Sequence, residues 1–200
     1  YSSRRQRQMC IRDRSNTMDE GAGNLNSHEF QKELTDKSIT LYFSSGRDDF
    51  TGTLKTLSRH KKRAFELLTL ALTEPRFDEE PFERMRTSNI ARIKKSQTDP
   101  QWQAARIMNS IAYEGHPYAF NSGGTLSTLP DITTTDVQAF KDNYLTKDRL
   151  LISVTGDMTP NELKTIMDDI FGKLPETGKA DNENTNKIKL QNAGKTYLYK

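Results

Sequence analysis

The residues that most often carry metal or nucleophilic chemistry are sparse in this chain, which has three histidines and one cysteine in 200 residues. His28 and His60 have no histidine or cysteine at the near spacings that zinc sites use. His116 stands between a glycine and a proline without an acid or nucleophile at a recognised spacing, so we interpret it as structural. Cys10 is alone, which excludes a disulfide within the chain and argues against a redox or cysteine-ligated zinc site.

Two other stretches could bind an anion. Residues 59–63 (RHKKR) crowd basic side chains into the first turn of an expected helix, and we interpret this run as a solvated face. Residues 121–124 (NSGG) lack the lysine of a phosphate-binding loop and have no strand directly before them. Neither stretch predicts a phosphate site.

Residues 74–100 (EPRFDEEPFERMRTSNIARIKKSQTDP) predict one amphipathic helix that ends before Asp99 and Pro100. Glutamates stand early in this helix and lysines late, which is the order that the helix dipole favours. One face should pack inward; it carries Phe82, Met85, Asn89 and Ile93. Arg92 lies two turns after Met85, on nearly the same face.

Four stretches in order over residues 17–175 resemble the pitrilysin/insulinase family of zinc metallopeptidases. They are LTEPRFDEEPFERMR, GHPY followed by GGT, NYLTKDRLLISVTGD and ELKTIMDDIFGKLP. The resemblance implies that active relatives bind zinc through a His-x-x-Glu-His motif and a glutamate on a downstream helix. By register, that glutamate's position is Arg92 here, and a supporting acid would fall at Met85. Arginine has no lone pair to offer a metal, so this sequence argues against zinc.

The histidine motif of the family would fall at residues 12–16, where Arg12, Ser15 and Asn16 do not match it. Residues 1–15 (YSSRRQRQMCIRDRS) lack the apolar centre of a secretory signal. They resemble a translated sequencing adapter, and we interpret them as a non-native or disordered tail, although a targeting segment or a basic nucleic-acid-binding arm stays open.

The charge of +3 is concentrated in that tail, because residues 1–14 hold five arginines and one aspartate and so carry a net charge of +4. The rest of the chain is then nearly neutral, which gives no electrostatic reason to expect nucleic acid. No apolar run is long enough to predict a membrane span.

Further helices are predicted from their starts. Asn26 with Glu29, Thr133 with Asp136, and Thr159 with Glu162 have capping-box spacing, and Asp99 precedes a proline. Residues 58–73 predict another helix with an apolar side. Along the helix that follows Pro100, apolar side chains recur at helical spacing and we expect Trp102 to anchor the core; they are Ala104, Ile107, Met108, Ile111 and Ala112.

Alternating residues predict a hairpin from residues 39–43 and 50–54, and residues 150–154 predict a short, well-buried strand. The fold class is therefore α+β, with a small, mostly antiparallel sheet covered by several helices. We expect a tail at residues 1–15, a peptidase-like domain at 16–175, and a linker with the start of a missing second domain at 176–200.

Three functions follow. The first is a non-catalytic family domain that binds peptide and lines the chamber of a homologous zinc-bearing partner, with no cofactor in this chain, no membrane and no assigned substrate-binding residue. The second is a fragment of an active zinc endopeptidase whose metal motif lies in a lost N-terminus. The third, a nucleic-acid-binding module, depends on the tail alone. The compartment stays open between the periplasm and the cytoplasm of a bacterium.

Overall fold

The structure, a computed structural model, describes residues 15–46, 48–178, 194 and 196, and the two ends of the chain lie outside this description. Its elements in chain order are η1 (Ser15–Asp19), α2 (Ser27–Asp36), β1 (Thr40–Ser45), β2 (Phe50–Lys55), η2 (Ser58–His60), α3 (Lys61–Thr73), α4 (Glu79–Ser96), α5 (Pro100–Ala112), η3 (Pro117–Ala119), α6 (Thr134–Tyr144), η4 (Lys147–Arg149) and α7 (Pro160–Phe171). The predicted α+β class is confirmed.

The chain divides into two compact units. The first, called the hairpin unit, contains the described residues up to 85 together with residues 133–178. The second, called the α5 unit, contains residues 86–132. The predicted division into tail, peptidase-like domain and linker stays a prediction, because residues 1–14 and most of 179–200 lie outside the described part of the chain.

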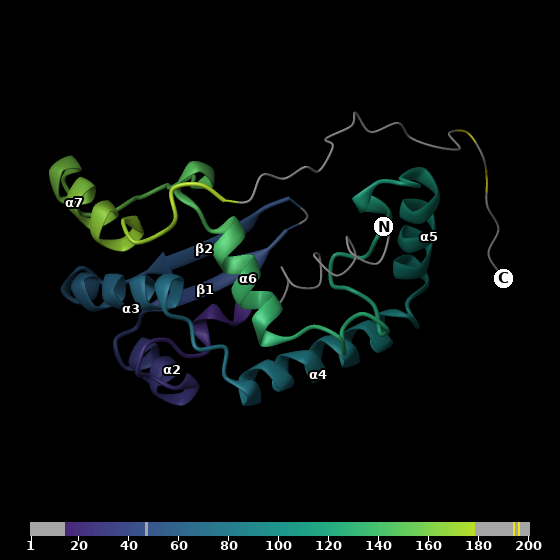
Figure 1. Cartoon of the computed structure of the whole chain (residues 1–200), viewed down its shortest axis with the longest axis horizontal. Helices are drawn as coiled ribbons and strands as arrows, with labels where there is room; N and C mark the ends of the chain where they lie inside the picture. Colours follow the sequence, from purple (N-terminus) through teal and green to yellow (C-terminus); the bar gives the residue numbers. More distant parts are fainter. Residues whose placement is uncertain (1–14, 47, 179–193, 195, 197–200) are drawn as a thin grey trace. The chain divides into compact units, whose positions relative to one another are not determined.

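The hairpin unit is built around β1 and β2, which pair antiparallel with Thr40 opposite Lys55 (Figure 1). Leu41 and Phe43 of β1 are buried, while Tyr42 between them is 47% exposed, as the alternation predicted. Aromatic side chains connect the hairpin to α6, because Phe50 stacks on Phe43 at 5.7 Å and meets Phe140 edge-on at 6.5 Å. Buried side chains from η1, α2 and α3 complete the core; they include Met18, Phe30, Leu34, Ala64, Leu67 and Ala71.

The predicted helix starts are confirmed. Asn26 and Glu29 form a reciprocal capping box at α2, and so do Thr133 with Asp136 at α6 and Thr159 with Glu162 at α7. The Asp99 side chain accepts from the Gln101 N–H at the start of α5. One boundary differs, because residues 58–60 form a 3-10 turn before α3 begins at Lys61.

The predicted strand at residues 150–154 is wrong. This segment forms no strand, and Leu151 is 98% exposed, Ile152 43% and Val154 42%. Among the described residues no neighbouring strand pairs with it, and a strand without a partner cannot satisfy its backbone groups.

The α5 unit has a small core, to which Ile93, Leu129 and Ile132 contribute. The expected burial along α5 is not found: no residue of this helix is buried, Trp102 is half-buried, and Met108 is 59% exposed. Within the described part of the chain, no helix is long and apolar enough to cross a bilayer.

Candidate functional site

Helix α4 carries both positions that the sequence singled out for chemistry. Its first turn holds Glu79 and Glu80 and its last turn Lys94 and Lys95, so the charges follow the helix dipole as predicted. Phe82 is buried in the hairpin unit, and Asn89 and Ile93 are buried in the α5 unit. The expected apolar face of this helix is therefore present.

Arg92 is exposed, although it lies two turns after the half-buried Met85 and directly precedes the buried Ile93. Its Nη2 donates to the Oδ1 of Asn89 at 3.2 Å, and Asn89 is 9% exposed. The guanidinium keeps its proton at any physiological pH and offers no lone pair, so it cannot serve as a zinc ligand. Its charge also repels a divalent cation.

Met85 is half-buried and presents a thioether, which is a weak acceptor and no substitute for a supporting carboxylate. Among the described residues, no three histidine, cysteine, aspartate or glutamate side chains gather closely enough to hold a metal ion. The donor groups that the structure places on α4 therefore do not fit zinc. The side chains at positions 12, 15 and 16, where the histidine motif would fall, lie outside the described residues.

The three histidines are far apart in sequence, and among the described residues none belongs to a group of side chains that could hold a metal ion. His28 is exposed on α2, and His60 accepts from the Nε of Arg59 at 3.2 Å. The Nδ1 of His116 accepts from the Tyr118 N–H at 3.2 Å, and its ring lies edge-on to Tyr118 at 4.7 Å. His116 thus caps the short turn η3, which supports its structural interpretation.

The basic run at residues 59–63 is engaged in structural contacts. Arg63 donates to both carboxylate oxygens of Glu33, at 2.6 and 2.9 Å, and to Glu66 at 2.9 Å. These carboxylates raise the pKa of the Arg63 guanidinium, and Arg63 in turn lowers the pKa of Glu33. Lys61 donates to the backbone carbonyl of Asp157 at 2.8 Å. At least two cations of this basic run, Arg63 and Lys61, therefore form contacts within the chain.

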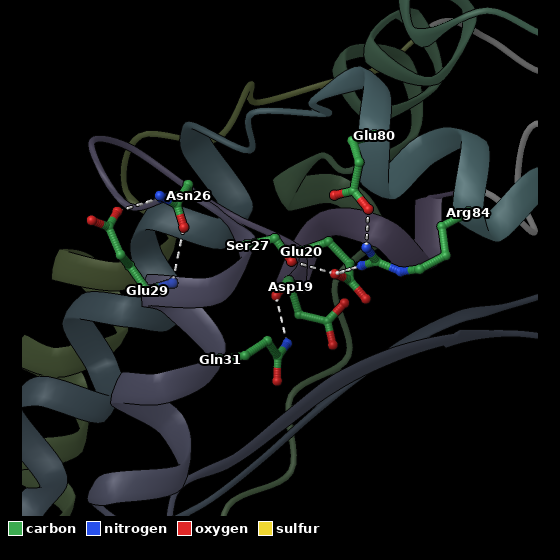
Figure 2. A network of polar contacts seen from close by, with 8 residues as sticks. All are labelled: Asp19, Glu20, Asn26, Ser27, Glu29, Gln31, Glu80 and Arg84. Atoms are coloured by element: carbon green, nitrogen blue, oxygen red, sulfur yellow. Dashed lines mark hydrogen bonds and ion pairs between the residues drawn. The ribbon is translucent and has the colours of Figure 1, made fainter.

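A polar network that the sequence did not predict connects η1, α2 and the start of α4 within the hairpin unit (Figure 2). Arg84 bridges two carboxylates, with Nη2 at 2.7 Å from Glu20 and Nη1 at 2.6 Å from Glu80. The Ser27 hydroxyl donates to the same Glu20 oxygen at 2.6 Å. The Gln31 side chain donates to the backbone carbonyl of Asp19 at 2.8 Å.

Asp19 is the titratable group with the most altered environment in this network. Burial raises the pKa of its carboxyl to about 7, and the nearby Glu20 charge adds to this effect while a hydrogen bond to the backbone opposes it. Among the described residues, no lysine or arginine forms an ion pair with Asp19. A carboxyl with such a pKa could exchange a proton near neutrality, but no metal-binding cluster accompanies it among the described residues.

Residues 131–199 match a family model described as the peptidase M16 inactive domain. Curated relatives are a non-peptidase homologue, YmxG, from Helicobacter pylori (22% identical over 83% of this chain), and an uncharacterized zinc protease YmxG from Bacillus subtilis (24% over 74%). A third is the mitochondrial-processing peptidase subunit beta of Neurospora crassa (20% over 78%). This chain spans only 38%, 33% and 33% of their respective lengths.

The fold is shared with a solved structure, a peptidase M16 inactive domain from Pseudomonas fluorescens. The superposition has a TM-score of 0.80 at 20% identity and covers 86% of this chain and 42% of the other. At this identity the likeness concerns the fold alone.

Proposed function

We propose, from the chain's membership of the peptidase M16 (pitrilysin) family as an inactive-domain homologue, that it is the non-catalytic half of a two-part zinc peptidase. In this proposal the chain binds peptide and completes the chamber of a homologous partner, and that partner holds the zinc. The observation that carries the proposal is the arginine at position 92, where the family resemblance requires a glutamate ligand.

The surroundings of Arg92 support this interpretation. Its contact with the buried Asn89 holds the guanidinium at the surface of α4, and Lys94 and Lys95 add positive charge to the same end of the helix. An Arg92→Glu change alone would not supply the two histidine ligands of the zinc motif. We therefore treat the loss of metal binding as a property of several positions, Met85 among them.

The names of two relatives support a division of labour between a non-catalytic and a catalytic subunit. The Helicobacter pylori relative is named a non-peptidase homologue, and the Neurospora crassa relative is named as one subunit of a processing peptidase. A chain related to both could keep the fold and a peptide-binding surface while a homologous subunit supplies the catalytic metal.

Reconstitution tests the proposal. A homologue with a His-x-x-Glu-His motif from the same genome is co-expressed with this chain, and peptide cleavage is measured for each alone and for the mixture. We expect a stable complex that cleaves peptide faster than the homologue alone. The zinc should be bound to the homologue and not to this chain. Cleavage by this chain alone, abolished by a chelator, would refute the proposal.

The second function, an active zinc endopeptidase, is favoured by the name of the Bacillus subtilis relative, which includes zinc protease. It needs a metal motif outside the described residues and a third ligand other than Arg92. Reading the genomic sequence around residue 15 decides between the two, because a His-x-x-Glu-His motif there would favour the enzyme.

A further inference from the structure

We draw no further inference here: the strongest candidate, the apolar segment of residues 151–155 between α6 and α7 of the hairpin unit, carries none, because nothing in the described part of the chain shows what covers it.

Discussion

Replacement of Asp19 by asparagine should stabilise the protein at pH 8 and have little effect at pH 4. Burial raises the pKa of this carboxyl from 3.8 in the unfolded chain to about 7 in the folded one. Between these values the folded state holds a proton that the unfolded state has lost, so this group makes stability fall as pH rises from about 4 to about 7. Asparagine keeps the shape without the charge and removes the slope.

The magnitude follows from the size of that change. At about 1.4 kcal/mol per pH unit, a pKa raised from 3.8 to about 7 corresponds to roughly 4 kcal/mol, as an upper value, because the denatured chain keeps some structure. We expect Asp19→Asn to gain about 2–4 kcal/mol over the original chain at pH 8.

Urea unfolding followed by circular dichroism at several pH values between 4 and 8 measures the effect. Asp169→Asn, an exposed change on α7, is the matched control and should give the same small difference at every pH. A loss of stability in Asp19→Asn that is equal at pH 4 and pH 8 would refute the reasoning. It would show that the side chain stabilises the fold and that burying its charge has no measurable cost.

Two further changes test the packing and the ion pairs of the hairpin unit. Phe82→Ala removes a side chain that is 1% exposed and should cost about 3–5 kcal/mol of unfolding free energy in the same urea assay; a cost below about 1 kcal/mol would contradict its place in the core. Arg63→Met leaves Glu33 without its two contacts and should cost about 1–2 kcal/mol at pH 7. Because Arg63 lowers the pKa of Glu33, this stabilisation is present above the ordinary pKa of the carboxyl and is lost as the pH falls. The unfolding free energies of the variant and the original chain should therefore converge in acid. A difference that persists at pH 2 would contradict the ion-pair account.

Local signals in the sequence were sufficient for most of the elements. A capping box is made by residues three positions apart, so Asn26 with Glu29 and Thr159 with Glu162 could be predicted without knowledge of the fold. The alternation of Leu41 and Phe43 likewise depends only on neighbours along one strand.

Features that need a distant partner could not be predicted in this way. Residues 150–154 have the composition of a strand, but a strand also requires a second one, and composition does not say whether it is present. The contact of Arg84 with Glu20 joins residues 64 positions apart, and no local sequence pattern predicts it. The pKa of Asp19 depends on burial by the whole unit and was missed for the same reason.

Zinc content tests the central claim most directly. The protein is purified from the cells that make it, without chelators, separated from any partner, and titrated with zinc while bound metal is counted per chain. The account predicts no stoichiometric zinc, both for the natural protein and for Arg92→Glu, with Lys95→Glu as the charge control. One tightly bound zinc per chain in the unmutated protein would contradict it.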